Sequence, residues 1–287
     1  MHVTSSLFGH TCGSFLRVGD ADLYYELLGD SAKPPLLLLH GGLGNITDFN
    51  PIADQLLDDF YLVGLDTRGH GRSSLGSAPL TYEQCEAEVI ALLRHLAVDN
   101  FSVLGFSDGG VVGYRLAANP EVRASSLVAL GAQWRLNEAD EAFSMLSGLT
   151  PDMWDAMFPT SRPYYESVNP SPDFARLVTH AVGLWTDLKP SSYPGDRVRN
   201  IAIPTLLVRG DSDPLFSLVE ATALQAKLPA ASLLNVPFAG HEVHVESPEL
   251  FMAVVRRFLL RPRHRATEAW GLCTDSSEGC ADMEVRR

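Results

Sequence analysis

The chain has 287 residues, enough for one large domain or two small ones, and 46% of them are hydrophobic, so a sizeable core can form. Its formal net charge of -13 argues against binding to nucleic acid, which requires a basic face, and to an anionic membrane surface. No apolar stretch reaches the roughly 18–20 residues of a membrane-spanning helix, and the N-terminus lacks a secretory signal pattern, so we expect a cytoplasmic protein.

Short apolar segments predict strands along the whole chain. Segments 15–18 and 23–28 predict a hairpin with Gly19-Asp20 near its turn. Segment 36–39 is continuously apolar, which is typical of a strand buried on both faces. Further strands are predicted at 61–65, 101–104, 127–130, 205–208 and, more weakly, 233–236.

Helices are predicted between these strands. Thr81 and Gln84 have the spacing of a capping box, and apolar residues at helical spacing follow them up to Leu96. Other helices are predicted at 107–118, at 217–228 and, with Ser247 as N-cap and Pro248 in the first turn, up to about residue 260. Alternating strands and helices favour an α/β fold with a mostly parallel sheet covered on both faces.

One interval interrupts this alternation. About 64 residues at 137–200 separate two core strands, and a structureless loop of that length is improbable in a compact domain. The interval is rich in aromatic residues, so we interpret it as a helical insert that folds over one edge of the core. The domain prediction is therefore a core at 1–136 and 201–262, the insert at 137–200, and a disordered tail at 263–287.

The four cysteines are too few and too scattered for a disulfide scaffold. Cys85 falls on the apolar face of a predicted helix and is interpreted as a core residue. Cys273 and Cys280 lie in the polar tail, where a bridge or a metal site is an alternative, although zinc requires closer pairs and more ligands. We expect neither a metal ion nor a cofactor.

A candidate nucleophile lies in Gly105-Phe106-Ser107-Asp108-Gly109, between a predicted strand and a predicted helix. Gly-x-Ser-x-Gly in this context is typical of a nucleophile elbow, a strained turn that exposes the serine hydroxyl. The flanking glycines allow close approach of the backbone, and the helix N-terminus favours developing negative charge. The alternative is a glycine-rich turn in which the serine caps a helix.

A serine hydroxyl needs a base, and the base needs an acid partner to orient it. His241 follows the last predicted strand, at the sheet edge where ligands meet an open α/β sheet, and His244 is the alternative. Asp213 and Asp211 both follow the strand at 205–208. We favour Asp213, which lies deeper in its loop, whereas Asp211 more readily caps the turn.

Donors for an oxyanion are expected from His40-Gly41-Gly42-Leu43-Gly44, which follows the strand at 36–39. Glycines allow this loop to approach the nucleophile. The N–H groups of Gly42 and Asp108 are the expected pair, with the Leu43 N–H as an alternative. A phosphate loop would have a lysine after the glycines, and this loop has none.

Four separated motifs now resemble those of the α/β-hydrolase superfamily, in its group with a helical cap after the sixth core strand. They are His40-Gly41-Gly42, the stretch from Asp66 to Ser73, the Ser107 elbow, and Gly240-His241 followed by Glu246, Pro248 and Phe251. The resemblance implies the α/β-hydrolase fold over about 14–260, with a structural loop at 66–73. It also implies that the insert shapes the substrate pocket, for which Leu43, Trp154 and Trp185 are the expected contacts.

The stretch Gly-x-Ser-Asp-Gly-Gly, with Asp108 after the nucleophile, resembles that of the biphenyl-hydrolase-like and valacyclovir-hydrolase-like branch, whose members cleave esters. Its carboxylate either favours amino-ester substrates or points away, so that only its N–H matters. The predicted function is hydrolysis of small carboxylic esters. Hydrolysis of lactones, thioesters, amides or carbon–carbon bonds and cofactor-free haloperoxidase activity are alternatives with the same triad, and a non-hydrolytic small-ligand sensor is an alternative of another class. The oligomeric state is left open.

Overall fold

The computed structural model describes residues 7–261, and within this range eight strands form one sheet. Along the sheet the strands lie in the order β1-β2-β4-β3-β5-β6-β7-β8. The predicted tail, with Cys273 and Cys280, lies outside the described residues. No helix of the described range combines the length and the apolar character needed to cross a membrane.

The sheet is antiparallel at one edge and parallel elsewhere. Strands β1 and β2 form the predicted hairpin, with Gly19 at a positive φ of 59° in the turn, and β2 pairs antiparallel with β4. All other neighbours are parallel. The strand bounds are β1 Ser14–Val18, β2 Ala21–Leu28, β3 Pro35–Leu39, β4 Tyr61–Leu65, β5 Phe101–Phe106, β6 Ala124–Leu130, β7 Thr205–Gly210 and β8 Ala231–Val236.

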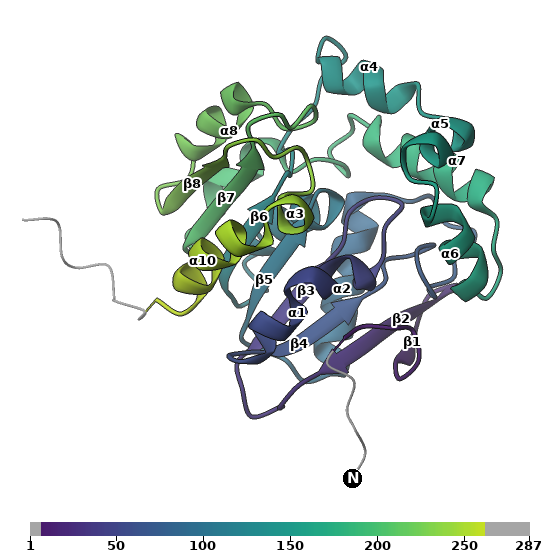
Figure 1. Cartoon of the computed structure of the whole chain (residues 1–287), viewed down its shortest axis with the longest axis horizontal. Helices are drawn as coiled ribbons and strands as arrows, with labels where there is room; N and C mark the ends of the chain where they lie inside the picture. Colours follow the sequence, from purple (N-terminus) through teal and green to yellow (C-terminus); the bar gives the residue numbers. More distant parts are fainter. Residues whose placement is uncertain (1–6, 262–287) are drawn as a thin grey trace, which may run out of the picture.

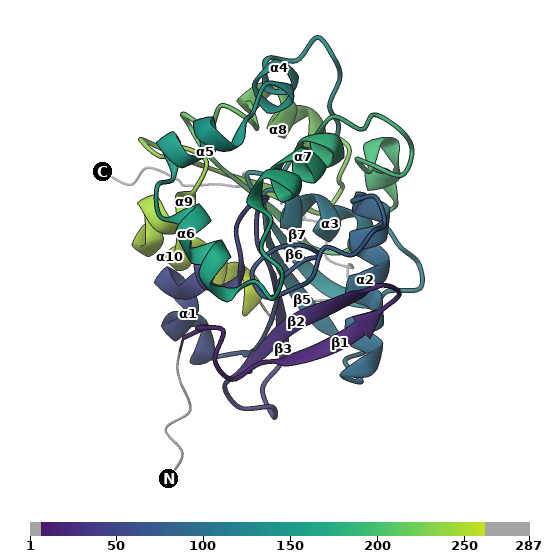
Figure 2. The same cartoon turned by 90° about the vertical axis from the view of Figure 1, so that its right-hand side faces the viewer.

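Helices cover both faces of the sheet (Figures 1 and 2). On β3, Leu36 and Leu38 pack in one core cluster with α1 (Asn50–Leu57) and α10 (Pro248–Leu259). Leu37 and Leu39 pack in the other cluster, with α2 (Tyr82–His95), α3 (Asp108–Ala117) and α8 (Leu218–Gln225). Because successive side chains of a strand alternate between faces, a run of leucines fills two cores at once. The predicted fold class is confirmed.

Local details differ from the predictions in several places. The 3-10 helix η1 (Ile46–Phe49) and α1 were not predicted, since α1 has eight residues and Pro51 in its first turn, too short for a clear helical period. Thr81 caps α2 by accepting from the N–H of Gln84, but the Gln84 side chain donates to Glu88, so the capping box is not closed. Ser247 precedes α10 without a side-chain capping bond.

Four α-helices lie between β6 and β7, in the interval predicted to be a helical insert: α4 (Glu141–Ser147), α5 (Pro151–Met157), α6 (Ser161–Val168) and α7 (Phe174–Trp185). They lie together above one end of the sheet (Figure 2). Helix α7 buries six side chains, whereas α5 buries none. The insert is therefore held mainly by α7 and by contacts of α6.

Helix α6 is joined to the core by a buried polar chain. The Tyr164 hydroxyl lies 2.7 Å from Nδ1 of His10, and Nε2 of His10 lies 2.7 Å from the Asp66 carboxylate. Just after α6, the Asn169 amide donates to the carbonyl oxygen of Gly71 at 2.8 Å. These bonds tie the insert to the loop that follows β4.

Candidate active site

Ser107 occupies a strained turn between β5 and α3. Its φ is +51° and its ψ is -116°, a conformation that is rare for a residue with a side chain. A Cβ on Gly105 would collide with the backbone of Gly109, and a Cβ on Gly109 would collide with the carbonyl oxygen of Leu39. Only glycine at both positions permits this turn, as the elbow motif requires.

The end of β6 lies directly beside this turn. The N–H of Ser107 donates to the carbonyl oxygen of Leu130 at 2.8 Å. Gly131 comes next, at a positive φ of 58°, and a Cβ there would lie 2.9 Å from Nδ1 and Cε1 of His241. Since His241 also packs against Phe106, with ring centroids 5.0 Å apart, the histidine lies at the same sheet edge as Ser107.

His241 and Asp213 are in direct contact. Nδ1 of His241 lies 3.0 Å from both carboxylate oxygens of Asp213. The Asp213 side chain is fully buried and its Oδ1 also accepts from the N–H groups of Leu215 and Phe216, while the His241 side chain is 20% exposed. A carboxylate at Nδ1 keeps the proton on that nitrogen, which leaves Nε2 as a proton acceptor.

The two alternative residues take no part in the contact between His241 and Asp213. Asp211 is exposed, and its carboxylate accepts from the Ser212 hydroxyl rather than from His241. His244 is fully buried, with its ring centroid 4.7 Å from that of Phe106. Burial lowers the pKa of His244 to about 3, so its ring stays neutral at ordinary pH.

Gly131→Ala should disturb this pair, because the added methyl group meets the His241 ring at a backbone conformation that disfavours alanine. If His241 is the predicted base, its displacement should lower kcat for the predicted ester substrate roughly 10- to 100-fold, because a displaced base misses the proton it must take. Gly183→Ala is the control, since no atom lies within 4 Å of a Cβ at this exposed helix position. Steady-state kinetics of both variants would reveal the difference, and equal activities would contradict it.

The glycine loop after β3 also reaches Ser107. The N–H of Gly109 donates to the carbonyl oxygen of His40 at 3.0 Å, and a Cβ on Gly41 would lie 3.2 Å from that of Ser107. The N–H of Thr67 donates to Nε2 of His40 at 3.0 Å. Burial lowers the pKa of His40 to about 4, so this histidine stays neutral and can accept that bond.

Backbone N–H groups of the two predicted donors and of their alternative, Leu43, remain available beside Ser107. Across residues 7–261, none of the N–H groups of Gly42, Leu43 and Asp108 donates to another protein group. Gly42 lies in the glycine loop, and Asp108 begins α3, where the N–H groups of the first turn have no partner within the helix. Both are the donors predicted for an oxyanion.

The Asp108 side chain is engaged inside the protein. Tyr82 donates its hydroxyl proton to Oδ1 at 2.7 Å, and Nε1–H of Trp185 donates to both carboxylate oxygens at 2.9 Å. Burial raises the pKa of the Asp108 carboxyl, and these two donors oppose that shift. The carboxylate thus joins α2 to α7 inside the protein.

The three predicted substrate contacts come from separate segments. Leu43 has a positive φ of 58° in the glycine loop and is buried, while Trp185 closes α7 so near Gly42 that a Cβ there would collide with its ring. Nε1–H of Trp154 donates to the Ser161 hydroxyl at 3.0 Å, which donates to the carbonyl oxygen of Leu43 at 3.4 Å. The insert therefore contacts the glycine loop through Trp185 and through Ser161, to which Trp154 donates.

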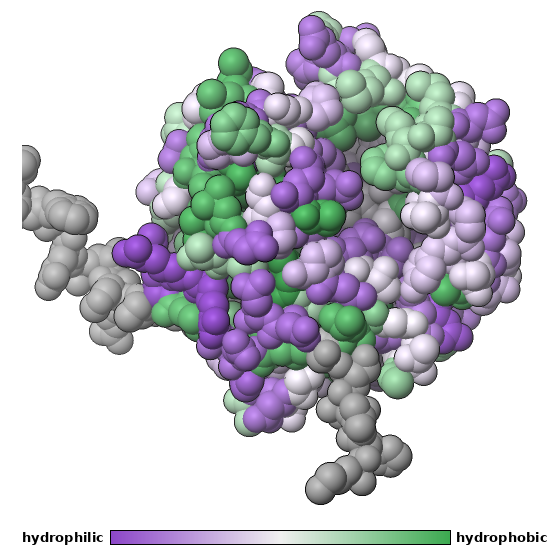
Figure 3. All heavy atoms as spheres, viewed as in Figure 1, coloured by the Kyte–Doolittle hydropathy of each residue, from purple (hydrophilic) through white to green (hydrophobic). Residues whose placement is uncertain are grey.

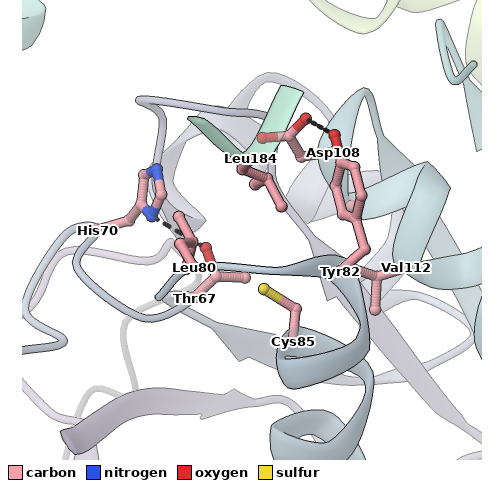
Figure 4. A pocket seen from close by; sticks show the side chains of 9 residues that line it. Thr67, His70, Leu80, Tyr82, Cys85, Asp108, Val112 and Leu184 are labelled. Carbon is pink, nitrogen blue, oxygen red and sulfur yellow. Dashed lines mark hydrogen bonds between the residues drawn. The ribbon is translucent and has the colours of Figure 1, made fainter. Parts of the chain in front are cut away.

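A small cavity lies beside Asp108 (Figure 4). It has room for about one water molecule. Its lining residues are Thr67, His70, Leu80, Tyr82, Cys85, Asp108, Gly109, Val112 and Leu184. This volume is too small for an organic substrate, so the cavity beside Asp108 is not a substrate pocket. The surface is also hollowed between the insert and the α8–α10 side of the core (Figure 3).

Asp48 in η1 adds a carboxyl group behind the glycine loop. Its carboxylate accepts from the N–H of Asn45 at 3.0 Å. Burial, together with the nearby charges of Glu242 and Asp66, raises the pKa of Asp48 to about 7, although the Asn45 hydrogen bond opposes the shift. The folded protein therefore keeps a proton here that the unfolded chain loses near the ordinary value of 3.8.

Asp48→Asn should flatten the pH dependence of stability. Because the folded-state pKa is the higher one, the contribution of Asp48 to the free energy of unfolding falls as pH rises from about 4 to about 7, and stays low above that. Asparagine cannot titrate but can still accept the Asn45 bond. Urea unfolding at several pH values should show a smaller fall in the free energy of unfolding for Asp48→Asn than for the wild type. The control Asp54→Asn, on the exposed side of α1, should show the same fall as the wild type. Parallel curves for Asp48→Asn and wild type would contradict this assignment.

Several residues at the site were not predicted. Gly131, Tyr82 and Asp48 contribute through contacts with residues far away in the chain, and only Gly131, directly after an apolar strand, carries a local signal for a special turn. In residues 7–261 no group of three or more histidine, cysteine, aspartate or glutamate side chains could hold a metal ion.

Comparisons with known proteins agree with this architecture. A family model described as "Alpha/beta hydrolase family" matches residues 36–254. The chain is 27% identical over 266 residues to 3-oxoadipate enol-lactonase 2 of Acinetobacter baylyi, which covers 85% of this chain and 96% of that protein. It is 23% identical over 236 residues to esterase YbfF of Escherichia coli, covering 78% and 92%. The crystal structure of a hydrolase from Pseudomonas aeruginosa superposes with a TM-score of 0.71 at 24% identity, covering 88% of this chain and 99% of that one.

Proposed function

Since the chain belongs to the alpha/beta hydrolase family, we propose that it is a serine hydrolase that cleaves small carboxylic esters through an acyl-enzyme intermediate. One observation carries the proposal. The Nδ1 of His241 lies within hydrogen-bond distance of both oxygens of the buried Asp213 carboxylate, and the His241 ring packs on Phe106, the residue before Ser107.

In the first half of the proposed reaction, Nε2 of His241 takes the hydroxyl proton of Ser107 as Oγ attacks the ester carbonyl carbon. The carbonyl oxygen becomes negative and accepts hydrogen bonds from the N–H groups of Gly42 and Asp108. Asp213 stabilises the imidazolium that forms. His241 then returns the proton to the leaving alkoxide, the bond to the alcohol breaks, and the acyl group remains on Ser107.

In the second half, water takes the place of the alcohol. His241 removes a proton from the water, the hydroxide attacks the acyl carbon, and the bond from the acyl group to Ser107 breaks as the serine recovers its proton. The insert would act as a cap over this chemistry. Its tryptophans, Trp154 and Trp185, together with Leu43, would contact the substrate and limit access of bulk water.

Lactone hydrolysis is the second candidate. A lactone is a cyclic ester, so the same triad and donors would open it, and the relative from Acinetobacter baylyi carries the name of an enol-lactonase. The two candidates differ in the space that the insert leaves for an open-chain or a cyclic substrate.

A substrate panel tests the proposal. We expect turnover of short aryl esters or lactones, and a fluorophosphonate probe should label the intact protein once, at Ser107 by peptide mass spectrometry. Carbon–carbon cleavage is assayed with vinylogous diketones. Folded protein that hydrolyses nothing in the panel and takes up no probe would support a ligand-binding role and reject the proposed chemistry.

A further inference from the structure

The carboxylate of Glu246 binds the main chain on both sides of His241. Glu246 ends the short helix α9 (Val243–Glu246). Its Oε2 accepts from the N–H of Gly240 at 2.8 Å, and its Oε1 accepts from the N–H of Glu242 at 3.2 Å. Hydrogen bonds to an ionised carboxylate are about twice as strong as those between neutral groups.

The other side of the same loop is fixed by the end of β7. A Cβ on Gly210 would collide with the carbonyl oxygens of Ala239 and Gly240, and the N–H of Ser212 donates to the Ala239 carbonyl oxygen at 3.0 Å. The backbone that carries His241 therefore lies between Gly210 on one side and Glu246 on the other. Within 237–242, His241 is the residue whose position the proposed reaction requires.

We propose that Glu246 is a positioning residue, which fixes the main chain at His241 so that the imidazole meets both Asp213 and Ser107. This inference rests on the proposed function. His241 is partly exposed, and Asp213 is its hydrogen-bond partner in the described structure, so the direction of Nε2 depends on where the backbone holds the ring. Glu246 is exposed, and its removal leaves no cavity in the core.

The experiment compares Glu246→Ala with Glu249→Ala in the full chain. Glu249 is an exposed glutamate in the first turn of α10, so its removal changes the net charge equally. We expect Glu246→Ala to lower kcat for an ester roughly 10- to 100-fold, with KM and the unfolding temperature little changed. Glu249→Ala should match the wild type.

Two further measurements separate positioning from general stability. Glu246→Gln keeps one carbonyl oxygen as acceptor but turns an NH₂ group toward the second N–H, so it should recover only part of the lost kcat. In proton NMR, the downfield resonance of the His241 Nδ1–H, identified by its loss in His241→Ala, should broaden in Glu246→Ala and stay sharp in Glu249→Ala.

Each outcome decides the inference. Wild-type kcat in Glu246→Ala, or an equal loss in Glu249→Ala, overturns it. If Glu246→Ala does not fold, Glu246→Gln decides, and a reduced kcat at an unchanged unfolding temperature supports the role. Fluorophosphonate labelling identifies which proposal has failed. If the wild type is not labelled, the triad fails and this role fails with it, whereas equal labelling rates for the wild type and Glu246→Ala overturn the role of Glu246 alone.

Discussion

Replacing Ser107 by alanine should lower ester turnover by about 10³- to 10⁶-fold and abolish fluorophosphonate labelling. Alanine keeps a Cβ at the same positive φ and removes only the hydroxyl oxygen, so the turn and the packing around it are preserved. The nucleophile is lost, and the remaining turnover would come from substrate binding and the oxyanion donors. Steady-state kinetics and intact-protein mass spectrometry check both results.

The control for this variant is its own stability. An unfolding temperature close to that of the wild type shows that the loss of turnover is chemical. Activity within about tenfold of the wild type would mean that another group attacks the substrate, and the assignment of Ser107 would be withdrawn.

Asp213→Asn should lower kcat by about 10⁴-fold, whereas Asp211→Asn should stay near the wild type. The asparagine Oδ1 can still accept from the N–H groups of Leu215 and Phe216, so the loop keeps its shape. Its NH₂ group then faces Nδ1 of His241 and drives the imidazole proton to Nε2. In that tautomer His241 cannot accept the proton of Ser107.

The two asparagine variants carry the same substitution at positions two residues apart, so Asp211→Asn is a matched control for Asp213→Asn. Asp211 is exposed and does not contact His241, so it controls for the loss of one negative charge from this loop. The kcat of each variant, measured with one aryl ester, decides the assignment. Equal losses in both would show that Asp213 is not the acid partner.

The strands and the elbow could be predicted because their signals are local. The leucines of β3 form a continuous apolar run since both faces of that strand are buried, and this run is visible in the sequence. The glycines around Ser107 are required by the backbone of the turn itself. β6 starts at Ala124 rather than at 127. The first residues of this strand were missed because they are not an apolar run: Ser126 is polar, although it is buried and donates to the Ser102 hydroxyl.

Other features of the site depend on contacts between distant parts of the chain. The direction of the Asp108 carboxylate is determined by Tyr82 and Trp185, which lie 26 and 77 residues away. Neither partner carries a motif, and both alternatives predicted for this side chain left them out. The same holds for Glu246, whose place in a family motif gives no sign that its two oxygens take two N–H groups.

The uneven attachment of the insert has a consequence for how its helices can move. Helix α5 has no fully buried side chain and packs on the core through the half-buried Trp154, so tilting it outward would uncover less apolar surface than moving α7. Lifting α6 would instead separate Tyr164 from His10 and Asn169 from Gly71, and would leave buried polar groups without partners. Of these two helices, α5 is therefore the one that can move at the smaller cost in buried contacts.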